Sequence, residues 1–267
     1  RGFCIRKHSM SGKFLRLWET KNKDDEWWSS FVTAPLGLLI NYVIIDIKWI
    51  TPNIITGVSF VTALLSALFV IEGGSFNFLI AAILIQLSHV FDCMDGQMAR
   101  YRKTTTASGS YFDRVSDQLQ VTIWFSSVAY ADFLQSGNIL PIILAFIGVA
   151  LYSLRGYVKY VAIHVKMTQN SQYLQDMEHL VQTNKKPIVA GYGFGFLANL
   201  KWFIVEQRKI LLFNEGVFIF MLSLSLVLNK LTPMLWVFFV SQLFWGLYRS
   251  WEQGRKINLN HHSTIEK

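Results

Sequence analysis

The chain has 267 residues, of which 52% are hydrophobic and only 16% are charged, whereas a soluble domain usually carries about 25% charged residues. Its two cysteines exclude a disulfide framework. The formal net charge is +8, which is also found in nucleic-acid-binding proteins. In a chain as apolar as this one, surplus lysine and arginine instead indicate cytoplasmic loops and contacts with anionic lipid. We therefore expect membrane lipid as a partner, and no nucleic acid.

Residues 1–52 are predicted to form a cytoplasmic segment that ends in an interfacial helix. Residues 1–26 are polar and basic, and they contain no apolar stretch long enough for a cleavable signal peptide. Residues 27–47 combine aromatic side chains with Pro35, Gly37 and Asp46, which favours an amphipathic helix in the membrane interface over a span. The chain begins with Arg1 rather than Met, which is consistent with the removal of an upstream segment.

Apolar stretches of spanning length begin at Pro52, where Thr51 is expected to be the N-cap and Pro52 the first helical residue. About 20 apolar residues cross a bilayer core, and the chain offers six such segments. The predicted spans are residues 53–72, 76–100, 111–134, 139–164, 211–228 and 232–250. The predicted fold is therefore an all-α integral membrane protein with six transmembrane helices, preceded by an N-terminal interfacial amphipathic helix. Residues 53–251 form its one membrane domain, and residues 252–267 a cytoplasmic tail.

The basic residues indicate how this domain is oriented in the membrane. Lysine and arginine concentrate in four regions that alternate along the chain: 1–48, 100–103, 166–209 and 249–267. By the positive-inside rule, both termini and the connection between the second and third spans are cytoplasmic. We expect a multi-pass protein of the cell inner membrane. The polar stretch 169–184 and the segment 194–209 between the fourth and fifth spans are predicted to contain further helical pieces.

Four carboxylates lie where the second and third predicted spans meet the cytoplasm. Asp92 and Asp95 are three residues apart, and Asp113 and Asp117 are four residues apart, so each pair lies on one helix face. If the two helices are antiparallel neighbours joined by a turn at 100–110, all four side chains converge. Unpaired carboxylates at such close range would repel each other and could not all stay ionised. Divalent cations resolve this conflict, and they commonly bind the phosphate oxygens of a substrate as well.

The chemistry of the ligands limits the choice of metal. Oxygen ligands alone favour Mg²⁺, Mn²⁺ or Ca²⁺ over zinc or copper. His89 is close in sequence, but we interpret it as too isolated to indicate a nitrogen-ligated site. The alternative for the carboxylates is a cation or proton pathway of a transporter, because intramembrane aspartates often serve ions.

The residues between the carboxylates favour a bound substrate over a transport pathway. Gly96, Ala99 and Gly109 are small where a bulky side chain would keep a ligand away from the helix backbone. Arg100 and Arg102 are placed at the mouth of the site, where they can meet phosphate. An ion pathway does not require small residues at these positions, so we infer a diphosphate substrate.

Taken together, the spacing of these residues resembles the signature of the CDP-alcohol phosphotransferase family. The eight specified residues are all present: Asp92, Asp95, Gly96, Ala99, Arg100, Gly109, Asp113 and Asp117. We call these eight the signature residues, and the four carboxylates among them the signature aspartates. The resemblance extends to Pro52, Asn53 and Thr56 at the start of the first span.

The resemblance implies six transmembrane helices, a homodimer and two divalent cations, Mg²⁺ or Mn²⁺, bound by the signature aspartates. Asp92, Asp95 and Asp113 would be metal ligands, and Asp117 would be both a ligand and the catalytic general base toward the acceptor hydroxyl. The residues implied for binding the CDP moiety are Asp92, Gly96, Ala99, Arg100 and Gly109. The implied reaction transfers a phospho-alcohol group from a CDP-alcohol to a hydroxyl and releases CMP.

The acceptor and the donor are less well determined by the sequence. Arg155 and Lys159 are four residues apart on the fourth predicted span, where they either hold an anionic group of the acceptor or extend toward lipid phosphate. For the donor we favour CDP-diacylglycerol, with a small polar alcohol as acceptor, in phospholipid biosynthesis. The alternative is a soluble donor, namely CDP-inositol, CDP-choline or CDP-ethanolamine. Residues 24–28 look similar to family members that make inositol-phosphate diesters, some of which carry an upstream nucleotidyltransferase domain.

Overall fold

The computed structural model describes residues 12–22, 26–183 and 195–265, and every regular element in these ranges is a helix. The predicted all-α fold is therefore confirmed. In chain order the elements are α1 (Gly12–Trp18), η1 (Ser29–Thr33), α2 (Ala34–Ile44), α3 (Pro52–Glu72), α4 (Ser75–Arg102), α5 (Ala107–Ser136), α6 (Leu140–Gln169), α7 (Tyr173–Thr183), α8 (Phe196–Glu206), η2 (Gln207–Leu212), α9 (Glu215–Val227) and α10 (Leu231–Ile265).

Four helices are long and apolar enough to cross a membrane: α3, α4, α6 and residues 231–257 of α10. This supports a multi-pass membrane protein. Helices α5 and α9 lie in the other two predicted spans, but neither is both long enough and apolar enough to cross a membrane. Helix α5 is long enough, but polar side chains occur along its whole length, including Asp113, Gln118 and Asp132, so it is not apolar enough. Helix α9 has only 13 residues, about 20 Å at 1.5 Å per residue, against a hydrocarbon core of about 30 Å.

Local sequence signals set the helix ends that surround the signature residues. The Thr51 side chain accepts a hydrogen bond from the Ile54 amide, as expected for the N-cap of α3. The Thr106 hydroxyl accepts a hydrogen bond of 3.0 Å from the Gly109 amide and so caps α5. Lys103 ends α4 in a left-handed conformation. The resulting short connection brings the start of α5 back beside the end of α4.

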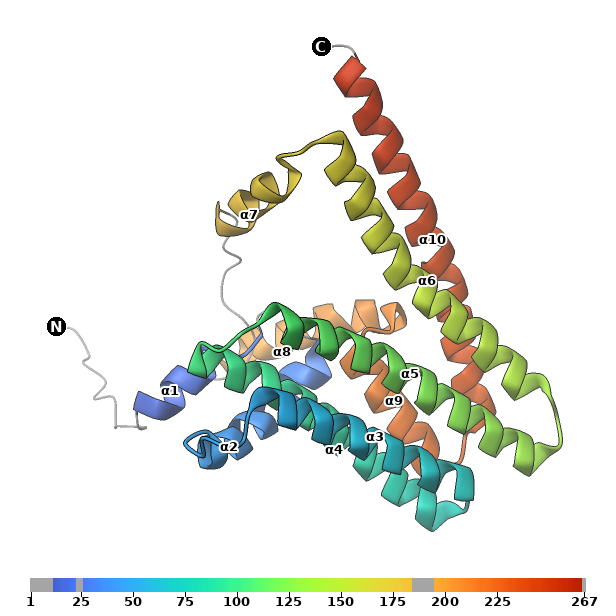
Figure 1. Ribbon diagram of the computed structural model, residues 1–267. Coiled ribbons are helices and arrows are strands. Elements are labelled where there is room, and N and C mark those ends of the chain that lie inside the picture. Colours follow the sequence, from blue (N-terminus) through green and yellow to red (C-terminus); the bar gives the residue numbers. More distant parts are fainter. Residues whose placement is uncertain (1–11, 23–25, 184–194, 266–267) are drawn as a thin grey trace.

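The long helices form two groups that meet at an angle (Figure 1). Helix α3 packs against both α4 and α5, and α6 packs along α10. The convergence of the four carboxylates was predicted on the condition that α4 and α5 are antiparallel neighbours, and α3 packs closely against each of these two helices. Polar side chains bridge α4 to α5, since the Ser88 hydroxyl donates to Gln120 Oε1 at 3.1 Å.

Buried aromatic side chains join the two groups of helices. Phe125 of α5 and Phe238 of α10 stack with ring centroids 3.6 Å apart. Gly148 of α6 permits this arrangement, because a Cβ atom there would lie 2.7 Å from the Phe238 ring. The core continues through Trp124 and Phe218, which are also almost fully buried.

Helix α2, which we expected to lie in the interface, packs against the half of α4 that carries the aspartates. A Cβ atom at Gly37 would lie 3.0 Å from Met94 Cγ, so the glycine allows a close approach. The Asn41 side chain donates to the Met94 carbonyl oxygen at 2.9 Å and to Gln97 Oε1 at 3.2 Å. The N-terminal segment therefore helps to hold the end of α4 in place.

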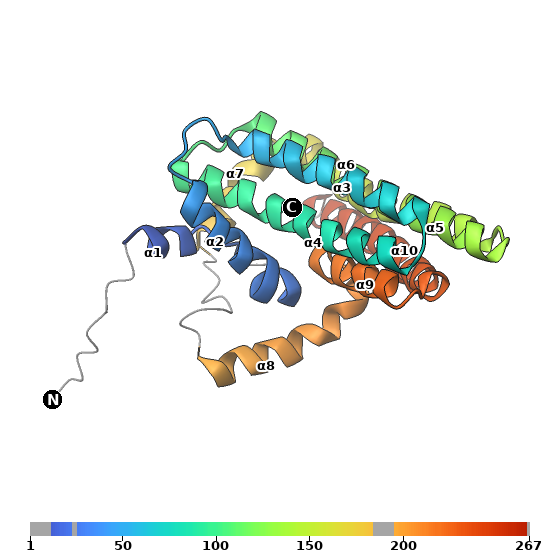
Figure 2. The same ribbon diagram turned by 90° about the horizontal axis from the view of Figure 1, so that it is seen from below.

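Helices α7 and α8 lie where further helical pieces were predicted. Figure 2 shows α8 along the edge of the bundle, apart from α3, α4 and α5. Helix α10 continues to Ile265, well past the predicted end of the last span at residue 250. The segment predicted as a tail thus prolongs the last helix through Ile265.

Candidate functional site

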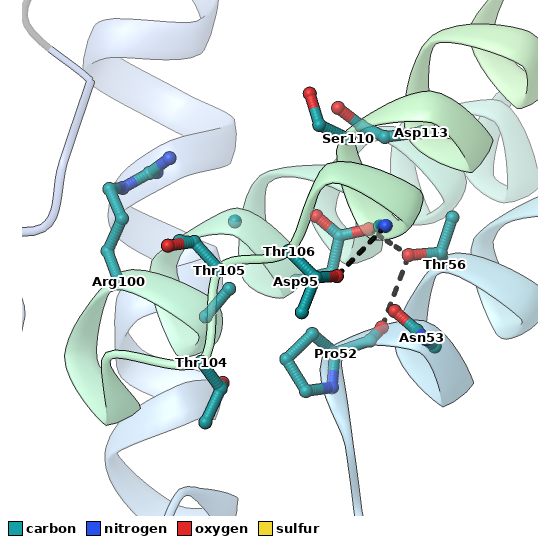
Figure 3. A pocket seen from close by; sticks show the side chains of 13 residues that line it. Pro52, Asn53, Thr56, Asp95, Arg100, Thr104, Thr105, Thr106, Ser110 and Asp113 are labelled. Carbon is teal, nitrogen blue, oxygen red and sulfur yellow. Dashed lines mark hydrogen bonds between the residues drawn. The ribbon is translucent and has the colours of Figure 1, made fainter.

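A cavity of about 240 Å³ opens where α3, α4 and α5 meet beside the loop that joins α4 to α5. Its lining comes from the first turns of α3, the last turns of α4, the loop and the first turns of α5 (Figure 3). Six of the eight signature residues line it: Asp95, Gly96, Ala99, Arg100, Gly109 and Asp113. Residues that the sequence separates by a loop are therefore brought together around one space.

The signature aspartates converge at one end of this region. Asp92, Asp95 and Asp113 each offer a carboxylate oxygen, and these oxygens all lie within 4.8 Å of one another. Asp92 Oδ1 and Asp117 Oδ1 are buried, and neither has a hydrogen-bond partner among the described residues. Buried acceptors without partners are costly, and a bound cation would satisfy them. The all-oxygen ligand set fits a hard divalent ion such as Mg²⁺ or Mn²⁺.

Thr56 connects α3 to this cluster. Its hydroxyl donates a hydrogen bond to Asp95 Oδ2, and the Pro52 carbonyl oxygen lies 3.2 Å from the same hydroxyl (Figure 3). The sequence marked Thr56 only as part of the start of the first span. Its contact with Asp95 could not be read from local spacing, because the two residues lie on different helices.

The two signature glycines make room for other parts of the protein at the cavity. A Cβ atom at Gly96 would lie 3.0 Å from Arg100 Nη1, so the glycine lets the guanidinium group fold back along α4. A Cβ atom at Gly109 would lie 3.0 Å from Thr106 Oγ1 and 3.5 Å from Asn53 Oδ1. Small residues here allow the helices to approach each other as well as leaving space for a ligand.

The two arginines at the end of α4 have different surroundings. Arg100 lines the cavity, and its Nε donates to the Thr20 carbonyl oxygen at 2.7 Å. Arg102 instead donates to the carbonyl oxygens of Ile45, Ile47 and Ile50 in the segment that follows α2. The expectation that Arg102 faces phosphate is therefore wrong, because its guanidinium group is engaged by backbone carbonyls.

Arg155 and Lys159 line a second cavity, of about 470 Å³, between α6, α10 and the start of α9. Gln118, next in sequence to Asp117, lies on its wall, and so does Arg249 of α10. Arg155 Nη1 donates to the Leu212 carbonyl oxygen at 2.7 Å, and its guanidinium carbon lies 5.3 Å from the centre of the Tyr152 ring. The sequence did not indicate Arg249, because it reaches this cavity only through the packing of α10 on α6.

His89 is not isolated, contrary to our expectation. It is 4% exposed, and its Nε2 atom lies 3.0 Å from Ser29 Oγ. Its Nδ1 atom lies 3.9 Å from Glu215 Oε1. His89, Asp92 and Glu215 each offer one metal-ligating atom, all within 4.8 Å of one another. Sequence reasoning missed Glu215 because it follows Asp92 by more than 100 residues and begins a different helix.

Residues 49–240 match the family model described as CDP-alcohol phosphatidyltransferase. A curated relative, the "Bifunctional IPC transferase and DIPP synthase" of Thermococcus kodakarensis, is 30% identical over 107 residues. That match covers 40% of this chain and 24% of the relative, so the chain spans about a quarter of that protein's length.

Proposed function

Because this chain belongs to the CDP-alcohol phosphatidyltransferase family, we propose that it transfers a phosphatidyl group from CDP-diacylglycerol to a small polar alcohol, releasing CMP, in phospholipid biosynthesis. The family implies a CDP-alcohol donor, an alcohol acceptor and a metal-dependent enzyme. The observation that supports the proposal best is the single cavity lined by six of the signature residues. A nucleotide held there would place its diphosphate beside the signature aspartates.

Each signature residue has a proposed role in this reaction. Asp92, Asp95, Asp113 and Asp117 would hold two divalent cations, Mg²⁺ or Mn²⁺, which when bound neutralise the donor diphosphate and the leaving CMP. Those expected to contact the CDP moiety are Asp92, Gly96, Ala99, Arg100 and Gly109. Thr56 would orient Asp95, because its hydrogen bond restricts the direction of that carboxylate.

In the transfer step, the acceptor oxygen attacks the phosphorus atom that carries the diacylglycerol oxygen. The bond from this phosphorus to the oxygen shared with the CMP phosphate breaks, and CMP leaves with that oxygen. The proton of the acceptor hydroxyl passes to the Asp117 carboxylate, which acts as the general base. The product is a phosphodiester that joins the two alcohols.

An apolar groove beside the nucleotide cavity supports a lipid donor. The groove, of about 380 Å³, lies between α3 and α5 and shares Asn53 and Thr56 with the nucleotide cavity. Its remaining lining is mainly apolar, including Phe60, Phe112 and Leu119. Acyl chains attached to a nucleotide in the first cavity could therefore continue past Asn53 and Thr56 into this groove.

The cavity of Arg155 and Lys159 is the proposed site of the acceptor. Arg249 adds a third cationic side chain to its wall. Arg249 Nη1 lies 3.9 Å from Glu252 Oε2, whereas Arg155 and Lys159 have no carboxylate partner among the described residues. An anion between these two cations would reduce their repulsion, which favours an acceptor with a phosphate or carboxylate group. Gln118, which lies on this wall, is next in sequence to Asp117, the proposed base.

A soluble donor is the second candidate. The Thermococcus kodakarensis relative is named for two activities, IPC transferase and DIPP synthase. That relationship, together with the cationic cavity, is consistent with CDP-inositol as donor and a phosphorylated acceptor. CDP-choline and CDP-ethanolamine belong to the same class of donor. We further propose that the enzyme works as a homodimer, with its active site and both termini on the cytoplasmic side of the cell inner membrane.

The test is CMP release by the purified protein in lipid nanodiscs with Mg²⁺ or Mn²⁺. CDP-diacylglycerol, CDP-inositol, CDP-choline and CDP-ethanolamine are each paired with a panel of polar and phosphorylated alcohols. We expect release with CDP-diacylglycerol, dependent on one acceptor and lowered about 10²- to 10⁴-fold in Asp117→Asn. Asp132→Asn is the matched control, since Asp132 lies on the same helix but bonds to Thr232. Release only with a soluble donor would select the second candidate, and no release from any pair would contradict both.

A further inference from the structure

A second polar cluster lies beside Asp92 and includes residues outside the signature. It consists of His89 on α4, Glu215 at the first position of α9, and Ser29 and Glu26 in the segment that leads into α2. His89, Asp92 and Glu215 offer ligand atoms within 4.8 Å of one another. The proposed phosphotransfer assigns no role to His89 or Glu215.

The hydrogen bonds around His89 favour the tautomer with its proton on Nε2. Ser29 Oγ donates to the carboxylate Oε2 of Glu26 at 3.4 Å. When its single hydroxyl proton points to Glu26, the same oxygen is an acceptor for His89 Nε2, 3.0 Å away. With the proton on Nε2, neutral His89 presents a lone pair at Nδ1, which is buried and without a hydrogen-bond partner among the described residues.

This lone pair faces oxygens that are also electron-rich. His89 Nδ1 lies 3.9 Å from Glu215 Oε1, and the Asp92 ligand atom belongs to the same group. A lone pair and two carboxylates turned toward one another repel unless a cation lies among them. An imidazole that binds a metal through one nitrogen usually donates its other N–H to a nearby group, as His89 does to Ser29.

Close packing holds these side chains in place. A Cβ atom at Gly216 would collide with Ser29 Oγ and would lie 3.3 Å from Glu26 Oε2, so the glycine allows the start of α9 to rest directly on this segment. His89 is 4% exposed, whereas the Glu215 side chain is 37% exposed. The cluster is therefore closely packed around His89 and accessible to an ion at Glu215.

We propose that His89, Asp92 and Glu215 form a cation site additional to the one at the signature aspartates, with Asp92 shared between the two. One imidazole nitrogen with two carboxylates suits Mn²⁺ or Zn²⁺ better than Mg²⁺, which prefers oxygen ligands and retains its waters. The proposed site consists only of these side chains, so the proposal does not depend on which donor and acceptor the enzyme uses. The competing arrangement is a protonated His89 ion-paired with Glu215, which would bind no metal.

The test uses the full chain in nanodiscs, stripped of metal and loaded with Mn²⁺ in the presence of excess Mg²⁺ and CDP. Pulsed electron paramagnetic resonance then reports whether an imidazole nitrogen is bound to Mn²⁺. We expect nitrogen modulation in the wild-type protein, its loss in His89→Gln, and at least about tenfold weaker Mn²⁺ binding in Glu215→Gln. His164→Gln, which changes an exposed histidine on α6, should keep the modulation. Ser29→Ala should keep His89 as a metal ligand but remove the hydrogen bond that orients its ring, so it should bind Mn²⁺ about 10- to 100-fold more weakly.

Absence of nitrogen modulation in the wild-type protein would overturn the proposal, and so would modulation that persists in His89→Gln. If His89→Gln fails to fold, Glu215→Gln and His164→Gln decide the point, because only the change at Glu215 should weaken Mn²⁺ binding. Because this readout involves no donor or acceptor, its failure would leave the phosphotransfer proposal untouched.

Discussion

The Thr56 hydroxyl on α3 donates a hydrogen bond to the Asp95 carboxylate on α4. This bond joins two helices at the cavity that the signature residues line. A hydrogen bond to a charged group contributes about 1.5–3 kcal/mol. We therefore expect Thr56→Val to weaken Mg²⁺ or Mn²⁺ activation, or to lower kcat/KM, by about 10- to 100-fold.

Thr56→Ser keeps the hydroxyl and should retain most of the activity, which makes it the matched control. CMP release measured against metal concentration checks both variants. Equal activities for the valine and serine variants would show that the hydroxyl has no part in positioning Asp95.

Removal of divalent cations is expected to abolish CMP release, and added Mg²⁺ or Mn²⁺ should restore it. The reason is that Asp92 Oδ1 and Asp117 Oδ1 are buried without hydrogen-bond partners among the described residues, so the site is incomplete without a cation. Mn²⁺ at 100 times its dissociation constant should also stabilise the fold by about 2.7 kcal/mol. A melting temperature unaffected by Mn²⁺, with activity that persists in a chelator, would rule out the metal site.

The double variant Arg155→Gln, Lys159→Gln should raise the KM for the acceptor by about tenfold or more, which corresponds to about 1.4 kcal/mol. The KM for the donor should change little, because these residues line a different cavity from Gly96 and Arg100. Lys166→Gln, on the same helix but outside that cavity, is the control. An unchanged acceptor KM in the double variant would mean that the two cations extend toward lipid phosphate instead.

Gly57→Leu should raise the KM for a lipid donor while the affinity for CDP itself stays the same. Gly57 lines the apolar groove, and no atom lies within 4 Å of a Cβ atom built there, so a leucine side chain would occupy the groove. Gly57→Ala adds only a methyl group and should behave like the wild-type protein. Kinetics with CDP-diacylglycerol measure the KM for the lipid donor, and calorimetry with CDP measures the affinity for the nucleotide.

Gly148→Ala is expected to reduce the free energy of unfolding by about 1–3 kcal/mol, the usual cost of overpacking a core. The new methyl group would lie 2.7 Å from the Phe238 ring, which is itself stacked on Phe125. Gly156→Ala on the same helix meets no atom within 4 Å and should be neutral or slightly stabilising. Thermal unfolding in detergent compares the two, and equal melting temperatures would contradict this account of the core.

The sequence by itself determined the features that depend on neighbouring residues. The spacing within each pair of aspartates places Asp92 with Asp95, and Asp113 with Asp117, on one helix face. The N-cap at Thr51 and the start of α3 at Pro52 also follow from local chemistry. The family resemblance rested on this local pattern, and the match over residues 49–240 bears it out.

The tertiary structure decided which residues from distant parts of the chain meet. The contacts of Thr56 with Asp95, of His89 with Glu215, and of Arg102 with the end of α2 all join different elements. Helical periodicity specifies the face on which a side chain lies, but not the partner that covers that face. That partner depends on how the helices pack. Here Gly37 allows α2 to approach α4, and Gly216 allows the start of α9 to approach Ser29 beside His89.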